Sequence, residues 1–185
     1  MTVLRIEGFV IVSADGMLAD ATHEMSATLK FAGDQHFFNA ALDRVDLVVH
    51  GRRSFEDQPN SPRRTRLILT RDTSSLAPDP VNPKATLWNP AGASFEAACD
   101  AAGVRAGTAA IIGGPAVFAM FFGRYDTFWL SEAPQVHIPG GLGVFPGVPE
   151  RTPHDILRAS GLRPTERRIL EAEGPVTVTA WRRPD

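Results

Sequence analysis

The stretch Ala109-Ala110-Ile111-Ile112-Gly113-Gly114-Pro115-Ala116-Val117-Phe118 carries the clearest information about the fold of this chain. Its first four residues are apolar and predict a buried strand, and residues 115–122 predict a helix. Paired glycines between a strand and a helix allow backbone N–H groups to approach an anion, because no Cβ obstructs the approach. Gly113 and Gly114 are therefore a candidate site for a cofactor pyrophosphate. The alternative is a tight turn without a ligand, because glycine pairs commonly mark turns.

The composition predicts one domain that spans residues 1–185. The chain is 43% hydrophobic and its formal net charge is -2, so a sizeable core is expected and no basic excess indicates a nucleic-acid partner. One cysteine, Cys99, excludes an intramolecular disulfide and a multi-cysteine metal site, and the histidines show no metal-ligand spacing. We expect no metal, no membrane partner and a cytoplasmic protein, because the chain has neither a long apolar span nor a signal-peptide pattern.

Strands are expected to alternate with helices along the chain. The expected strands are 4–14, 47–50, 66–70, 85–88, 109–112, 126–131, 162–169 and 176–183, and the expected helices are 31–44, 95–102 and 115–122. Segments 73–83 and 140–149 predict loops. The alternation implies right-handed crossovers and a parallel sheet covered on both faces. Because no helix is expected between the last strands, we predict an antiparallel C-terminal edge on a single-domain α/β fold.

Ligands of open parallel sheets bind beyond the carboxyl ends of the strands. Four turns are expected at that edge, and we expect a phosphorylated redox nucleotide to lie across them: 13–16, 51–54, 70–72 and 113–115. The turn Gly51-Arg52-Arg53-Ser54 offers backbone N–H groups, cations and a hydroxyl to a phosphate.

Thr70 and Arg71 repeat this chemistry at the next strand end. Cations at two strand ends beside one dinucleotide favour NADPH over NADH, because they could pair with its 2′-phosphate. The alternative is that these arginines are solvated surface charges.

Asp15 and Asp34 are the candidate catalytic and substrate-binding acids. Asp15 lies in an Asp-Gly turn, where a hydrogen bond to its own backbone is the alternative role. Asp34 begins the helix 31–44, where an acid is favoured by the helix dipole alone. Either carboxylate could bind the amidine edge of a substrate through paired hydrogen bonds, or handle a proton.

Four motifs follow one another in a fixed order along the chain. They are Val12-Ser13-Ala14-Asp15-Gly16-Met17-Leu18-Ala19, Asp46-Leu47-Val48-Val49-His50-Gly51-Arg52-Arg53-Ser54-Phe55-Glu56, Ile111-Ile112-Gly113-Gly114-Pro115, and Ala133-Pro134 with Gly140-Gly141-Leu142-Gly143-Val144-Phe145-Pro146. This order resembles the dihydrofolate-reductase-like superfamily, most closely the C-terminal reductase domain of the bifunctional riboflavin-biosynthesis deaminase–reductase. The resemblance covers nearly the whole chain.

The resemblance implies a mixed sheet of about eight strands, NADPH as the hydride donor and a homodimer. The implied cofactor contacts are Gly51, Arg52, Arg53 and Ser54 at the phosphates, Thr70 and Arg71 at the 2′-phosphate, Gly113, Gly114, Ala116 and Val117 around the pyrophosphate, and the backbone of Leu18 and Ala19 at the nicotinamide. The implied substrate contacts are Ser13, Asp15 and Gly16, as in the riboflavin reductases, and Asp34. In this chain Asp34 is the nearest match to the acid that grips the pterin in dihydrofolate reductases, but one extra residue separates it from Gly51.

The chain departs from this family in the substrate half of the site. Residues 21–29 replace a Ser-Gly-Glu-Ser-x-Trp-like stretch and lack its tryptophan, and the zinc deaminase domain is absent from the sequence. The cations that could meet a substrate phosphate are Lys30, Arg63, Arg64 and Arg66.

We therefore expect an NADPH-dependent reductase of a pyrimidine- or pterin-like heterocycle. The preferred activity is that of a 5-amino-6-(5-phosphoribosylamino)uracil reductase in riboflavin biosynthesis. Dihydrofolate reductase is one alternative, and a non-catalytic nucleotide-binding protein is an alternative of another class.

Overall fold

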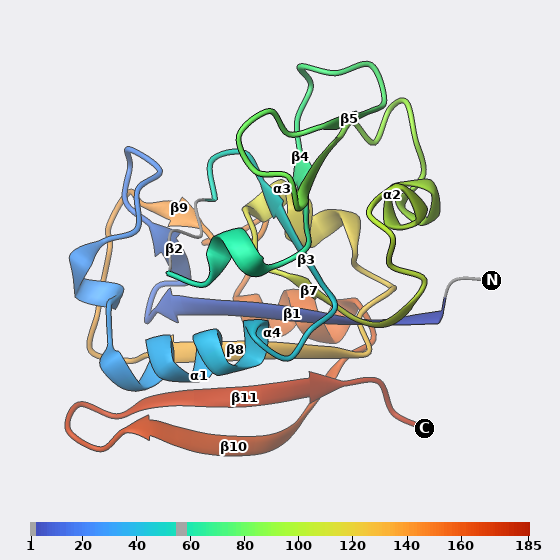
Figure 1. Ribbon diagram of the computed structural model, residues 1–185. Coiled ribbons are helices and arrows are strands. Elements are labelled where there is room, and N and C mark those ends of the chain that lie inside the picture. The colour runs from blue at the N-terminus through green and yellow to red at the C-terminus, as the bar shows by residue number, and fades with distance from the viewer. Residues whose placement is uncertain (1–2, 55–58) are drawn as a thin grey trace.

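A computed structural model describes residues 3–54 and 59–185 of the chain. In these residues the main sheet consists of β1 (Val3–Ser13), β3 (Leu47–Gly51), β4 (Arg66–Leu69), β5 (Leu76–Pro78), β6 (Ala85–Trp88), β7 (Ala106–Ile111), β8 (Thr127–Ala133), β10 (Arg163–Glu171) and β11 (Val176–Arg182). Their order is β10-β11-β8-β1-β7-β3-β4-β6-β5 (Figure 1). Strands β8, β1, β7, β3, β4 and β6 run parallel, whereas β11, β10 and β5 pair antiparallel with their neighbours. The predicted α/β class, mostly parallel sheet and antiparallel C-terminal edge are confirmed.

Helices cover both faces of the sheet. Helix α1 (Ala32–Leu42) packs on one face, where its Leu42 joins Phe9 and Val48 in one core cluster. Helices α2 (Phe95–Ala101), α3 (Pro115–Met120) and α4 (Pro153–Ala159) share a larger cluster with Leu47 and Val49. Successive side chains of a strand point to opposite faces of the sheet. In β3, Val48 therefore faces α1, whereas Leu47 and Val49 face the other helices. A parallel sheet with crossover helices is buried in this way on both sides.

Short elements differ from the sequence-based prediction. Strands β2 (Met17–Ala19) and β9 (Leu142–Gly143) pair with each other, β5 falls within the expected loop 73–83, and β9 falls within the expected loop 140–149. Segments this short have no measurable periodicity, so pairing with another strand determines whether they form strands. Short 3-10 turns also occur, η1 (Ala27–Leu29) and η2 (Ser61–Arg63).

Helix α4 is absent from the sequence-based prediction. It buries Ile156 and Leu157 but has only 7 residues, too few for a clear helical pattern. The available signal is its start, where the Thr152 side chain accepts a hydrogen bond from the Asp155 N–H and Pro153 occupies the first helical position.

Candidate active site

The four predicted turns follow strands that are neighbours in the sheet. Strands β1, β7, β3 and β4 lie side by side in this order and run parallel, so their carboxyl ends share one edge. The turns after them are 13–16, 113–115, 51–54 and 70–72. The structure therefore brings all four turns to one rim, as the sequence pattern suggests. Phe55 and Glu56, which end the second motif, lie outside the described residues.

The turns after β3 and β7 contact each other directly through their glycines. The N–H of Gly51 donates to the carbonyl of Gly113 over 2.7 Å. A Cβ built on Gly113 or on Gly114 would lie 3.5 Å from the Ser54 hydroxyl oxygen, and the Cβ on Gly113 would also lie 3.3 Å from the Phe118 ring. A Cβ on Gly51 would lie 3.4 Å from Val117. Gly113 has a φ of 120°, which disfavours other residue types, and the Gly113–Gly114 peptide is cis. These residues form a cradle of bare backbone with one hydroxyl beside it.

The predicted cations around this cradle differ in their surroundings. Arg52 forms an ion pair with Asp72, which joins the turns after β3 and β4, and both side chains are largely exposed. Arg53 and Arg71 are exposed. The Thr70 hydroxyl accepts a hydrogen bond from the Asp72 N–H over 3.1 Å, so it supports the turn. Asp72, which the sequence analysis did not single out, places an acid next to the proposed 2′-phosphate contact.

The other predicted cofactor contacts also lie in or beside these turns. Ala116 is exposed on the first turn of α3, and Val117 is buried behind it. Leu18 and Ala19 belong to β2, which pairs with β9. The Ala19 side chain is buried, so only its backbone could meet a ligand.

Asp15 is held by hydrogen bonds within the protein. The Ser13 hydroxyl donates to its carboxylate over 2.5 Å, and the Ile138 N–H lies 3.1 Å from each carboxylate oxygen. Burial raises the pKa of Asp15, but these hydrogen bonds outweigh it, so the pKa lies below its usual range. Gly16, with a φ of 82°, turns the chain into β2. Asp15 thus fastens the turn after β1 to the loop after β8.

Asp34 lies in a different environment, on the buried side of α1. The residue is only 7% exposed. Burial raises the pKa of Asp34 to about 6, although a hydrogen bond with the Ser131 hydroxyl acts in the opposite direction. Ser131 in β8 pairs with Ile11, two residues before the end of β1. Asp34 therefore lies near the carboxyl edge of the sheet, with a carboxyl that is partly protonated near neutral pH.

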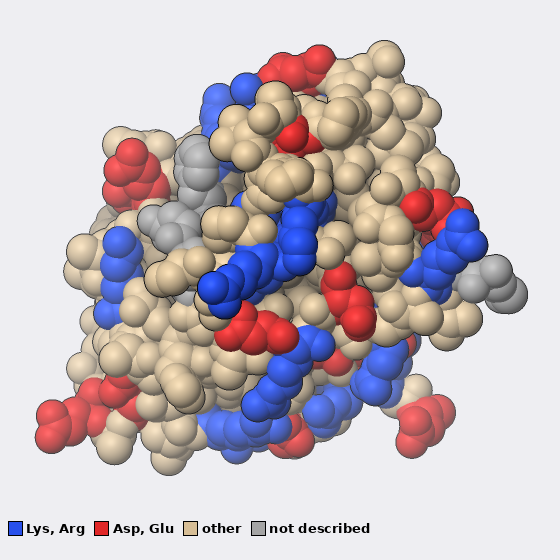
Figure 2. All heavy atoms as spheres, in the orientation of Figure 1, with Lys and Arg blue, Asp and Glu red and all other residues tan. Residues whose placement is uncertain are grey.

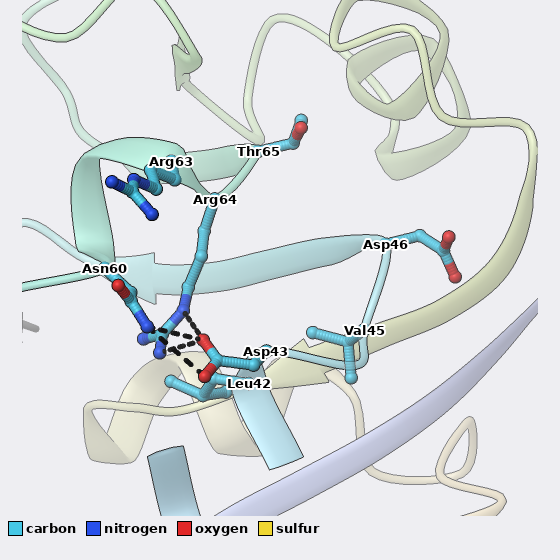
Figure 3. A pocket seen from close by; sticks show the side chains of 8 residues that line it. All are labelled: Leu42, Asp43, Val45, Asp46, Asn60, Arg63, Arg64 and Thr65. Carbon is cyan, nitrogen blue, oxygen red and sulfur yellow. Dashed lines mark hydrogen bonds and ion pairs between the residues drawn. The ribbon is translucent and has the colours of Figure 1, made fainter. Parts of the chain in front are cut away.

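Arg64, one of the cations considered for a substrate phosphate, already has a carboxylate partner. Its guanidinium is buried and donates to Asp43 over 2.6 Å and to Asn39 over 3.3 Å. Figure 3 shows Arg64, Asn60 and Asp43 pointing toward one another in a cavity of about 290 Å³. This cavity lies before β3 and β4, at the rim opposite to the four turns.

The remaining candidate cations are dispersed. Lys30 and Arg63 are exposed, and Arg66 is partly buried in β4. On the face seen in Figure 2, basic and acidic side chains alternate rather than forming one basic surface. Within the described part of the chain, no three His, Cys, Asp or Glu side chains gather as a metal site, and no helix has the length and apolarity to span a membrane.

Ser131 and Ile138 contact the two candidate acids but have no signature in the sequence. Ser131 is one of several polar residues in β8, and Ile138 contributes only its backbone N–H. Both contacts join segments that are far apart in the chain, so no local pattern could identify them.

Comparisons with known proteins agree with this architecture. No protein-family model and no curated protein matches the chain. A solved structure of a candidate riboflavin biosynthesis protein from Shewanella sp. PV-4 is 20% identical, covers 98% of this chain and 100% of its own, and has a TM-score of 0.65. Dihydrofolate reductase from Enterococcus faecalis, complexed with NADP(H) and RAB-propyl, is 17% identical over 100% of both chains, with a TM-score of 0.68. These likenesses show that the chain has the dihydrofolate-reductase-like fold.

Proposed function

We propose that this chain, which has the dihydrofolate-reductase-like fold, is an NADPH-dependent reductase of a pyrimidine- or pterin-like heterocycle. The preferred substrate is 5-amino-6-(5-phosphoribosylamino)uracil or its close analogue, and dihydrofolate is the second choice. One observation carries the proposal. A buried carboxyl with a pKa of about 6 lies at the same edge of the sheet as a cradle of bare glycine backbone.

The cradle fits the pyrophosphate of a dinucleotide. Gly51, Gly113 and Gly114 offer close backbone approach, and the Ser54 hydroxyl beside them could donate a hydrogen bond to a phosphate oxygen. Helix α3 has only 6 residues, so backbone access rather than a long helix dipole supports this site. Arg53 and Arg71 are exposed and could reach phosphates from the neighbouring turns. When bound, NADPH would supply the hydride, which this chain cannot supply by itself.

Asp34 is the proposed proton donor. Reduction of a C=N bond adds a hydride to carbon and a proton to nitrogen, so the protein must provide an acid near the substrate. Asp34 is partly protonated near neutral pH and can give up that proton. Asp15 is ionised at neutral pH, because its pKa is lowered, and its oxygens already accept hydrogen bonds. We therefore assign Asp15 to shaping the turn beside the substrate, together with Ser13 and Gly16.

The test is to mix the protein with NADPH and each candidate heterocycle in turn. Oxidation of NADPH is measured as the loss of its nicotinamide absorbance. Wild-type protein should consume NADPH with the riboflavin-pathway pyrimidine, and the rate should fall as the pH rises above 6, since protonated Asp34 is lost. Asp34→Asn should lower kcat by about 10²–10⁴-fold. Asp15→Asn should keep the pH dependence. Full activity in Asp34→Asn would remove Asp34 from the proton-donor role.

A nucleotide-binding protein without turnover is the second candidate. The observation that favours it is the place of Arg64, which pairs with Asp43 at the rim opposite to the four turns and so is not available to a substrate phosphate beside them. Tight NADPH binding without oxidation by any of the heterocycles would support this alternative over the reductase.

A further inference from the structure

Helix α1 begins with a hydrogen-bond partner from a distant strand. Its N-cap residue, Phe31, has no side-chain hydrogen bond to the helix. The backbone N–H of Gly33 instead donates to a carboxylate oxygen of Glu171 in β10, 2.6 Å away. A helix leaves its first N–H groups unpaired unless a side chain or water accepts from them. Glu171 therefore takes the place of a local cap.

The shapes of both elements permit this contact. A Cβ on Gly33 would lie 2.1 Å from the carbonyl oxygen of Leu170, so only glycine allows the helix to approach β10 this closely. The pairing of β10 with β11 shifts between Ile169 and Glu171. Ile169 pairs with Thr177, and Glu171 pairs with Val176. Because Thr177 and Val176 are adjacent in β11, their side chains point to opposite faces of the sheet. The bulge thus turns Glu171 toward α1, and Figure 1 shows the end of β10 beside the first turn of α1.

Asp34 follows Gly33 directly in the chain, so the bond that the Gly33 N–H donates to Glu171 fixes the Ala32–Gly33 peptide group, one residue before Asp34. We propose that Glu171 is a positioning residue, which caps α1 and thereby holds the Asp34 carboxyl buried against Ser131. This inference deepens the proposed function and rests on it, because Asp34 is the proton donor proposed there.

The strands packed against α1 carry charged groups of both signs. On this face β1 carries Arg5 and Glu7, β11 carries Arg182, and β10 carries Glu171 and Arg168, with Glu166 in ion pairs to Arg168 and Arg182. Glu7, Arg168 and Arg182 gather around Trp129 in β8, two residues before Ser131. The pKa of Asp34 is raised by burial, not by these charges. Loss of the cap should therefore lower this pKa by admitting water to the first turn of α1.

The test is a carbon-13 NMR titration of Asp34 in the whole chain, with the resonance assigned from Asp34→Asn. Glu171→Ala should move the midpoint from about 6 toward the ordinary value of 3.8. It should also speed amide exchange in the first turn of α1 by about fivefold, as expected for a lost cap. Glu171→Gln should keep the wild-type midpoint, because its amide oxygen can accept the same bond. Glu173→Ala is the matched control, since Glu173 is exposed two residues further on.

An unchanged Asp34 midpoint in folded Glu171→Ala protein would overturn the proposal, and so would an equal shift in Glu171→Gln. If Glu171→Ala does not fold, Glu171→Asp replaces it. Its carboxylate is one methylene shorter, so it must shift the midpoint in the same direction, and no shift overturns the proposal. The titration uses neither NADPH nor a substrate. A protein that shows the shift but oxidises no NADPH would contradict the proposed function and leave the positioning role of Glu171 supported.

Discussion

Two carboxyl groups near one rim differ in their ionisation because their surroundings differ. Asp34 is buried with one hydroxyl as partner, and its pKa rises to about 6. Asp15 is partly exposed and accepts hydrogen bonds from a hydroxyl and a backbone N–H, so its pKa falls despite some burial. When their surroundings shift the pKa values of two acids in opposite directions, one acid can donate a proton while the other stays ionised. At the residue scale, burial therefore distinguishes candidates that look equivalent in sequence.

Asp34→Asn should stabilise the folded protein at neutral pH but not in acid. A carboxyl with a higher pKa in the folded state costs stability once the pH exceeds its unfolded value, and the cost is complete above the folded pKa. The gain in the free energy of unfolding should therefore develop as the pH rises from 3.8 to about 6. A shift of this size is worth at most about 3 kcal/mol. Urea denaturation across pH measures it, and an equal gain in acid and at neutral pH would contradict this account.

Arg71→Ala should weaken NADPH binding by about tenfold or more and leave NADH binding nearly unchanged. Its proposed partner, the 2′-phosphate, is present only in NADPH, and a charge-assisted hydrogen bond is worth about 1.5–3 kcal/mol. Titration calorimetry with both cofactors measures the difference. Arg53→Ala is the matched control and should weaken both cofactors alike, because its proposed phosphate occurs in both. Equal losses in Arg71→Ala would remove Arg71 from the 2′-phosphate role.

At the scale of elements, the strand ends and the turns between them set the shape of the site. Gly113 has a positive φ and would strain any substitution, whereas Gly114 has a φ of -82°. A Cβ on Gly114 meets only the Ser54 hydroxyl, at the ordinary contact distance of 3.5 Å. The turn between β7 and α3 can therefore accept a methyl group at one glycine without a change in the fold.

Gly114→Ala should keep the unfolding free energy within about 0.5 kcal/mol of wild type. It should nevertheless weaken NADPH binding, because the added methyl group occupies the space that we assign to the pyrophosphate. Thermal denaturation and fluorescence titration measure the two effects separately. Undiminished NADPH affinity in a folded variant would place the pyrophosphate elsewhere.

The packing of β1 against β8 depends on another glycine. A Cβ on Gly8 would lie 2.3 Å from the ring of Phe128, which is completely buried. Gly8→Ala should therefore destabilise the protein by about 1–3 kcal/mol through overpacking. Adding Phe128→Leu should recover part of this loss, and a double-mutant cycle by urea denaturation measures the coupling. Strictly additive losses would show that the two residues do not compete for space.

At the scale of the whole molecule, the sheet order assembles the site. The turns after β1 and β7 lie about one hundred residues apart in the chain, yet their strands are adjacent. A ligand that spans such turns binds only the folded state and must raise the melting temperature.

NADPH at about 100 times its Kd should raise the melting temperature by about 5–10 °C for a chain of this size. Differential scanning calorimetry with and without the cofactor measures this shift. The same cofactor concentration should shift Gly114→Ala much less. Absence of any shift in the wild-type protein at saturating NADPH would contradict both nucleotide-binding proposals.

The amino-acid pattern alone predicts the longer strands, the helices α1, α2 and α3, the α/β class and the four turns. Apolar periodicity and glycine turns are local properties, and parallel strands necessarily end at a common edge. The fold is needed to see that Asp34 is buried against Ser131, that the Asp15 carboxylate accepts from the Ile138 N–H, and that Arg64 pairs with Asp43. It also decided the short strands β2, β5 and β9. The burial of a side chain and the pairing of a short strand depend on contacts between segments that are far apart in the chain. A local sequence pattern does not show which distant segments come into contact.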